Sequence, residues 1–203
     1  MAMTITYEFE GSLYVNLTNQ CSNDCVFCLR NNQDSVNGKD NLWLDREPTL
    51  EEIKSDFARR NMNNYNWVVF CGYGEPLMRF DTCIETAKWL KVTYPHIKIR
   101  INTNGQANMI EKRDVTPEFD QIIDALSISL NAPDAKRYDQ LCKSVFGEAA
   151  FDGLLDFAKK ASAYVPSVTL SIVDKDLSDD DKKKCEAMAK ECGVLFRIRD
   201  YIE

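Results

Sequence analysis

Apolar residues recur at two spacings along this chain, and the spacing changes from segment to segment. Runs in which apolar and polar residues alternate predict β-strands, whereas an apolar residue at every third or fourth position predicts a helix. Six runs have the strand pattern: Ser12–Thr18, Trp67–Cys71, Ile97–Thr103, Asp124–Asn131, Ser167–Asp174 and Val194–Asp200. Helical patterns separate them, the first opening at the Thr49–Glu52 capping sequence and the others covering Asp81–Tyr94, Asp134–Val145, Phe151–Tyr164 and Ser178–Cys192. This alternation predicts an α/β fold with a parallel sheet.

The predicted strands have one aliphatic face and one polar face. In the fourth run, for example, Leu126 and Ile128 alternate with Ser127 and Ser129. A parallel strand that is buried on both sides is apolar throughout, so we expect helices to cover the aliphatic face and the polar face to line a wet or ligand-filled space. Six strand–helix units are too few for an eight-stranded barrel. The pattern fits an open, six-stranded parallel partial (β/α)6 barrel, and a sheet with one face in solvent is the alternative.

The composition is that of an ordinary soluble globular domain. The 203 residues, 44% of them apolar and 28% charged, predict one domain spanning residues 1–203. There is no apolar run of the roughly 18 residues that a membrane span needs, and the N-terminus lacks the basic and apolar regions of a signal peptide. We therefore expect a cytoplasmic protein. The net charge of −7 argues against general nucleic-acid binding, because phosphate contacts need Lys and Arg.

Eight cysteines in a reducing compartment do not indicate a disulfide framework, so their spacing has to be examined. Cys21, Cys25 and Cys28 follow the first predicted strand within one short loop. Three thiolates at this spacing can hold a [4Fe–4S] cluster, and three ligands on four irons leave one iron open for reaction. The alternatives are three unrelated thiols, or a zinc site with a distant fourth ligand. Zinc sites usually pair two CxxC units, and this chain has only one.

The same cysteine spacing, with Phe27 directly before the last cysteine, resembles the radical S-adenosylmethionine (SAM) superfamily. Three later segments resemble other motifs of that family: Gly72–Pro76 its Gly-Gly-Glu-Pro segment, Asn102–Gly105 its Thr-Asn-Gly segment, and Ser127–Asn131 its ribose-contacting segment. The motifs occur in order at predicted strand ends, and the resemblance favours the partial barrel over a one-sided sheet. Tyr73 is a departure, because the commoner pattern has Gly at that position.

This resemblance implies that Cys21, Cys25 and Cys28 bind a [4Fe–4S] cluster whose fourth iron takes the methionyl group of SAM. Enzymes of the family cleave SAM with one electron and use the 5′-deoxyadenosyl radical to remove hydrogen from a substrate. The resemblance also implies SAM contacts at Phe27, Gly74, Glu75, Asn102, Ser129 and Asn131. The whole chain is similar to the small radical SAM proteins that are associated with TatD-type nucleases. This resemblance implies no particular substrate.

The resemblance leaves the substrate and the partners open. It implies an electron donor such as a flavodoxin or a ferredoxin, and a functional link to a TatD-type nuclease. A macromolecular substrate could itself close the barrel mouth, as for an activase that places a glycyl radical on a partner enzyme, and a small-molecule substrate is the alternative within the family. Outside the family, the alternatives are an electron-transfer iron–sulfur protein that does not bind SAM and a zinc-binding interaction domain.

Two arginines alternate with apolar residues in the last predicted strand, which places Arg197 and Arg199 on the interior face, and Arg100 adds a third cation there. A buried guanidinium suits a carboxylate or a phosphate. We therefore predict that Arg199 binds the SAM carboxylate or an acidic group of the substrate. Arginines in water on an edge strand are the alternative, because charged side chains protect sheet edges.

Two further features carry hypotheses. Cys71 and Cys142 lie at or just beyond strand ends, where a catalytic thiol could face the cavity. The polar stretch Asn31–Pro48 follows the cysteines directly, so we expect it to lie over the barrel mouth. It contains Trp43 between two leucines. Trp43 either forms part of a lid or partner contact, or anchors the stretch on the protein's own surface.

Overall fold

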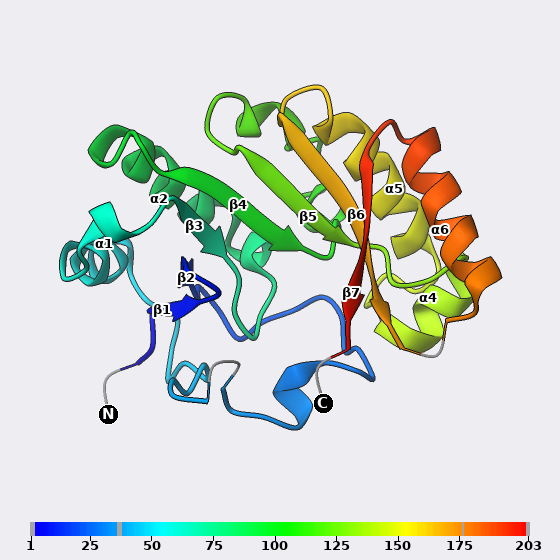
Figure 1. The fold of residues 1–203 in the computed structure, drawn as a ribbon, viewed down its shortest axis with the longest axis horizontal. Helices are drawn as coiled ribbons and strands as arrows, with labels where there is room; N and C mark the ends of the chain where they lie inside the picture. The colour runs from blue at the N-terminus through cyan, green and yellow to red at the C-terminus, as the bar shows by residue number, and fades with distance from the viewer. Residues whose placement is uncertain (1–2, 36–37, 176, 202–203) are drawn as a thin grey trace.

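Seven β-strands form one sheet in which spatial order follows chain order (Figure 1). The computed structural model describes residues 3–35, 38–175 and 177–201. The strands are β1 (Thr6–Phe9), β2 (Ser12–Val15), β3 (Trp67–Phe70), β4 (Lys98–Thr103), β5 (Ala125–Ser129), β6 (Ser167–Asp174) and β7 (Leu195–Asp200). Strands β2 to β7 run parallel to their neighbours, whereas β1 pairs antiparallel with β2. The six parallel strands and the unclosed sheet confirm the predicted fold class.

Strand β1 is the strand that the sequence pattern did not reveal. It is four residues long and joins β2 through a turn at Glu10 and Gly11, whose φ angles are 47° and 72°. A turn with two positive φ angles matches the twist of an antiparallel hairpin. β1 therefore adds one edge strand to the predicted sheet and leaves its parallel core unchanged.

Helices connect the parallel strands, as predicted. They are α1 (Leu50–Ala58), α2 (Phe80–Thr93), the short α3 (Ala107–Ile110), α4 (Ala135–Cys142), α5 (Ala149–Ala161) and α6 (Asp179–Glu191), with 3-10 turns η1 (Leu29–Asn31), η2 (Met62–Asn64), η3 (Pro76–Arg79) and η4 (Thr116–Phe119). Capping boxes start α1 at Thr49 and α6 at Ser178. α4 ends earlier than the pattern predicted, because Lys143 takes a left-handed conformation with φ 45°.

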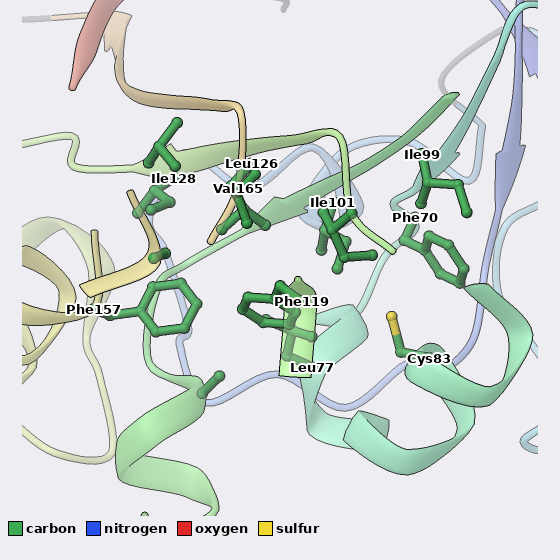
Figure 2. Close-up of a cluster of buried hydrophobic side chains, with 14 of the residues drawn as sticks. Phe70, Leu77, Cys83, Ile99, Ile101, Phe119, Leu126, Ile128, Phe157 and Val165 are labelled. Atoms are coloured by element: carbon green, nitrogen blue, oxygen red, sulfur yellow. The ribbon is translucent and has the colours of Figure 1, made fainter. Parts of the chain in front are cut away.

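One hydrophobic core lies between the sheet and the helices. Figure 2 shows Ile101 of β4 and Ile128 of β5 on the side of the sheet that faces Phe119, Phe157 and the thiol of Cys83. All five side chains are fully buried, so Cys83 is a core thiol. In the described parts of the chain, every helix is too short or too polar to span a bilayer.

The other face of the sheet has two unlike halves. Over β1–β3 it is apolar, because Tyr7, Tyr14, Val69 and Tyr73 pack around the buried Leu42. Over β4–β7 it is polar. The strand register places on that side Arg100, Asn102, Ser127, Ser129, Thr169, Ser171, Arg197 and Arg199. A polar ligand therefore has room for favourable contacts over β4–β7 and not over β1–β3.

Candidate cofactor site at the carboxyl ends of the strands

The cysteine loop, residues 19–32, follows the end of β2 and is held by the last turn of α4 and the chain directly after it. The main-chain N–H of Val26 donates to the carbonyl of Leu141, and that of Val145 donates to the carbonyl of Ser22, both at 2.9 Å. The loop therefore forms an extra backbone pairing with a segment more than a hundred positions away in the sequence.

A buried polar network holds the same loop from a second side. Gln106 follows β4 and is fully buried; its amide oxygen accepts hydrogen bonds from the hydroxyls of Ser22 (2.8 Å) and Ser144 (3.0 Å). Its amide nitrogen donates to Asn23 Oδ1 (2.8 Å) and to the Tyr138 hydroxyl (3.0 Å). Every hydrogen-bonding position of this amide is used, and a satisfied buried network favours one rigid arrangement. The sequence pattern did not single out Gln106, although it directly follows the Thr-Asn-Gly segment.

Glu75 joins the turn after β3 to the end of β4. Its buried carboxylate accepts hydrogen bonds from the Thr103 hydroxyl (2.8 Å) and from the main-chain N–H groups of Asn104 (2.7 Å) and Leu77 (3.1 Å). Burial raises the pKa of Glu75 to about 7, and these three donors act in the opposite direction by stabilising the charged form. Both carboxylate oxygens of this predicted SAM contact are therefore engaged within the protein, and the side chain positions the loops around it.

Gly74 is required by a close approach of two loops. A Cβ atom at this position would lie 2.3 Å from the carbonyl oxygen of Thr18 and 2.5 Å from that of Gln20, and both are main-chain atoms that cannot turn aside. The N–H of the next residue, Glu75, donates to the Gln20 carbonyl at 2.8 Å. The glycine that was predicted to contact SAM thus also allows the loop after β3 to pack directly on the cysteine loop.

The three predicted cluster ligands share the loop, but each thiol has its own neighbours. Cys21 Sγ accepts from the N–H of Asn23 at 3.4 Å, whereas the thiol of Cys25 contacts that of Cys142. Burial raises the pKa of Cys28 and raises that of Cys21 to about 12, and the contact with Cys142 raises that of Cys25. Within the described residues, no three Cys, His, Asp or Glu side chains converge as metal ligands do. Binding one cluster through all three thiols therefore requires these side chains to move closer together.

Arg30 is a residue of this site that the sequence pattern did not reveal. Its guanidinium donates to the carbonyl oxygens of Asn19 (3.3 Å) and Tyr73 (3.4 Å), and it pairs with Asp24 at 3.7 Å. Its positive charge acts to lower the pKa of all three loop cysteines, against the effect of burial. Arg30 thus ties the cysteine loop to the loop after β3 and favours the thiolates that a metal cluster needs.

Four of the residues predicted to contact SAM lie near the carboxyl ends of the strands in the polar half of the sheet. They are Asn102, Ser129, Asn131 and Arg199. The Nη2 atom of Arg199 lies 3.4 Å from Ser129 Oγ, and burial lowers the pKa of this arginine. The Oδ1 atoms of Asn102 and Asn131 and the Nε atom of Arg199 are buried without a hydrogen-bond partner among the described residues. Buried polar groups are nearly always paired. These three atoms therefore fit a polar ligand bound at this edge of the barrel.

Phe27 lines a small pocket of about 30 Å³ beside the cysteine loop. The other lining residues come from the cysteine loop, the end of β5, α4 and the end of β6, and they are Val26, Asn131, Leu141, Val173 and Lys175. The pocket is mostly apolar with one amide and one ammonium group. Its volume is about that of one water molecule and lies well below the roughly 300–1,000 Å³ typical of small-ligand sites. This pocket is therefore too small in this structure to hold a heterocycle.

The two further candidate thiols have different surroundings. Cys71 directly follows β3 and lies on the interior side near Asn102 and Arg199; burial raises its pKa, and these two neighbours act against that rise. Cys142 is fully buried in α4, where it contacts Cys25. Cys142 therefore lies behind the cysteine loop and does not face the cavity, whereas Cys71 is placed where the hypothesis of an interior thiol requires it.

The stretch that contains Trp43 lies across the apolar half of the interior. Leu42 is fully buried, and Asn16 Nδ2 donates to its carbonyl at 2.7 Å. Trp43 is 40% exposed; its ring packs against Tyr73, and its Nε1 donates to Asp34 at 3.1 Å. In this structure Trp43 anchors the stretch on the protein's own surface. Positions 36 and 37 of the predicted stretch lie outside the described residues.

Known proteins share both the sequence pattern and the fold. The profile of the radical SAM superfamily matches residues 15–187. Two curated proteins named "Probable GTP 3′,8-cyclase" are similar: that of Methanocaldococcus jannaschii is 27% identical over 94% of this chain and 59% of its own length, and that of Pyrococcus horikoshii is 26% identical over 92% and 54%. This chain therefore spans less than two thirds of either relative.

Solved structures show the same architecture. Streptococcus suis SuiB bound to its precursor peptide SuiA superposes with a TM-score of 0.68 at 17% identity, over 94% of this chain and 39% of that one. A radical SAM methyltransferase from Sphaerobacter thermophilus superposes with a TM-score of 0.64 at 18% identity, over 96% and 57%.

The partial barrel and its three-cysteine loop define an α/β protein of the iron–sulfur type. The chain belongs to the radical SAM superfamily, whose members are enzymes that use a [4Fe–4S] cluster and SAM. The residues present fit both groups: three cysteines on one loop supply the thiolates, and unpartnered buried atoms at the neighbouring strand ends supply polar contacts.

Proposed function

We propose that this chain cleaves SAM at the carboxyl ends of β4–β7, with the cluster held by the three cysteines of the loop. When bound, the cluster and SAM supply one-electron cleavage to a 5′-deoxyadenosyl radical, which removes a hydrogen atom from the substrate. The observation that carries the proposal is the set of unpartnered buried atoms on Asn102, Asn131 and Arg199, which lie around the strand ends next to that loop.

The chain's own residues divide the binding of SAM between them. Phe27 flanks the adenine, and the hydroxyl of Ser129 with the amide of Asn131 takes the ribose. Arg199 takes the carboxylate, because a guanidinium binds a carboxylate with two parallel hydrogen bonds. The apolar cluster around Leu42 keeps water out of the other half of the interior, which protects a reactive intermediate from side reactions.

The proposal includes partners and a compartment. A flavodoxin or a ferredoxin supplies the electron, and a TatD-type nuclease is a functional partner because of the family resemblance. The cytoplasm is the compartment, because all eight cysteines are free thiols and such thiols persist in a reducing environment. The name of the curated relatives makes a nucleotide one candidate substrate.

The test is the formation of 5′-deoxyadenosine by anaerobically reconstituted, reduced protein. We expect slow formation without substrate, and none from the Cys28→Ala variant; Cys192→Ala, which removes a thiol at the end of α6, is the matched control. An intact cluster whose spectrum does not respond to SAM, together with the absence of 5′-deoxyadenosine, would contradict the proposal and favour an electron carrier. Zinc in place of iron after reconstitution would favour the interaction domain.

A further inference from the structure

A second cavity lies deeper in the polar half of the interior than Arg199. It has a volume of about 210 Å³, which is room for a small anionic group together with a few water molecules. Its lining consists of Trp67, Arg100, Ala125, Leu126, Ser127, Ser167, Thr169 and Arg197. Trp67, Ala125 and Ser167 are the first residues of their strands, so the cavity extends toward the amino ends. Arg197 precedes Arg199 by two residues, a rise of roughly 7 Å along a strand.

The arginines of this wall lack acidic partners. Arg100 Nη2 donates to the Tyr14 hydroxyl at 3.1 Å, while its Nε atom is buried without a hydrogen-bond partner. In the described part of the chain neither Arg100 nor Arg197 forms an ion pair, whereas an acid pairs with each of Arg30, Arg46, Arg59, Arg60, Arg79 and Arg113. In a chain of net charge −7, acids are plentiful, and none is placed on this wall.

We propose that this cavity binds an anionic group of the substrate, a phosphate or a carboxylate, between the guanidinium groups of Arg100 and Arg197. The hydroxyls of Ser127 and Thr169 are further donors in the same lining. Two guanidinium groups match the oxygens of such anions in geometry and in charge. The inference rests on the proposed function, because the anion fixes one end of the substrate while its reacting C–H bond points to the strand ends where SAM binds.

The position of the cavity also indicates the size and chemistry of the substrate. Arg197 and Arg199 are separated by roughly 7 Å along the strand, a separation that a small molecule can span. The indole of Trp67 supplies an apolar wall, with Lys98 Nζ 5.7 Å above its ring. The substrate class is therefore a phosphorylated or carboxylated small molecule, rather than the main chain of a partner protein.

Anion binding can be measured without turnover. Anaerobically reconstituted protein is titrated with inorganic phosphate and, separately, with succinate, by calorimetry at constant ionic strength. We expect saturable binding of at least one probe, and an affinity about tenfold lower in Arg197→Gln, the loss of one charged hydrogen bond. Arg197 is exposed, so this variant leaves no buried group unpaired.

Arg59→Gln is the matched control, because Arg59 is an exposed arginine at the end of α1. Arg100→Lys is the second variant and should weaken the same probe.

The outcomes separate this inference from the proposed function. No saturable binding of either probe, or equal weakening by Arg197→Gln and Arg59→Gln, overturns the anion site. The probe that binds more tightly identifies the anion as phosphate or carboxylate. Formation of 5′-deoxyadenosine is measured in parallel on the same samples. Anion binding without formation of 5′-deoxyadenosine supports the anion site and contradicts SAM cleavage. Formation of 5′-deoxyadenosine without anion binding supports SAM cleavage and contradicts the anion site.

Discussion

The ring of Tyr73 packs against the ring of Trp43, with the ring centroids 5.2 Å apart and the planes inclined at 66°. The Tyr73 hydroxyl also donates to the carbonyl of Gln33. One side chain from the loop after β3 therefore holds two points of the chain that follows the cysteine loop. At this position, where the sequence departs from the Gly-Gly-Glu-Pro pattern, the tyrosine side chain packs beside Leu42 and fastens the stretch that covers the apolar half.

Removal of this anchor should loosen that stretch. Tyr73→Ala deletes a ring packed on Leu42 and Trp43, and large-to-small changes of this kind cost about 3 kcal/mol. We expect faster hydrogen exchange across residues 38–48 and a lower free energy of unfolding in urea. Tyr164→Ala, at a ring that is 37% exposed, is the control and should change little. Exchange in residues 38–48 that is as slow as in the parent protein would show that Tyr73 is not the anchor.

The cysteine loop makes a prediction about iron content. Cys21→Ala, Cys25→Ala and Cys28→Ala should each lose stable iron, because two thiolates hold a four-iron cluster poorly. Cys142→Ala should keep it, since Cys142 contacts Cys25 from behind the loop and is not one of the three ligands. Iron and sulfide per chain after anaerobic reconstitution are the measurement. A full cluster in any of the three loop variants would refute the ligand assignment.

Gln106 should be a positioning residue for the cysteine loop. Gln106→Leu leaves the buried polar groups of Ser22, Asn23, Ser144 and Tyr138 with fewer partners, and each unpaired group costs about 1–3 kcal/mol. We expect a marked loss of stability in urea and faster loss of a reconstituted cluster to an iron chelator. Gln20→Leu, at an exposed position of the same loop, is the matched control. Equal cluster lifetimes in the two variants would contradict this role.

Arg199 and Ser129 should contribute unequally to SAM affinity. Arg199→Ala removes a charged donor, worth about 1.5–3 kcal/mol, whereas Ser129→Ala removes one neutral hydrogen bond, worth about 1 kcal/mol. The SAM dissociation constant of the reconstituted protein is the measurement. Arg59→Ala tests whether loss of any arginine has the same effect, and it should leave the affinity unchanged. An unchanged constant in Arg199→Ala would mean that this arginine does not bind the carboxylate.

Burial of Glu75 predicts a pH dependence of stability. Its pKa rises from 4.5 to about 7 on folding, so the folded protein holds a proton that the unfolded chain releases. This stabilisation is present below the unfolded pKa and is lost as pH rises through the folded pKa. The shift corresponds to about 3 kcal/mol. We expect the unfolding free energy of the parent protein, relative to Glu75→Gln, to fall by most of this amount between about pH 5 and about pH 8. Parallel pH curves for the two proteins would exclude the buried titration.

Short-range pattern was sufficient for much of the fold. The alternation in β5, with Leu126 and Ile128 on one side and Ser127 and Ser129 on the other, identified both the strand and the face that meets the helices. The Thr49 capping box marked the start of α1 correctly. Strand β1 escaped detection because four residues carry too little periodicity, and it exists through its pairing with β2.

Features of the site that depend on residues close together in the chain could be predicted from the sequence. Features that depend on contacts between distant residues could not. The spacing of the cysteines and the individual strands and helices are each specified within a few residues, and the alternation of strands and helices along the chain indicates a parallel sheet. Folding in three dimensions brought Ser22 to Gln106 across 84 positions and Arg199 to Ser129 across 70. It also turned Cys25 toward Cys142 and engaged the Glu75 carboxylate with the end of β4. These contacts arise from packing and hydrogen-bond satisfaction in a buried environment, and no local pattern encodes them.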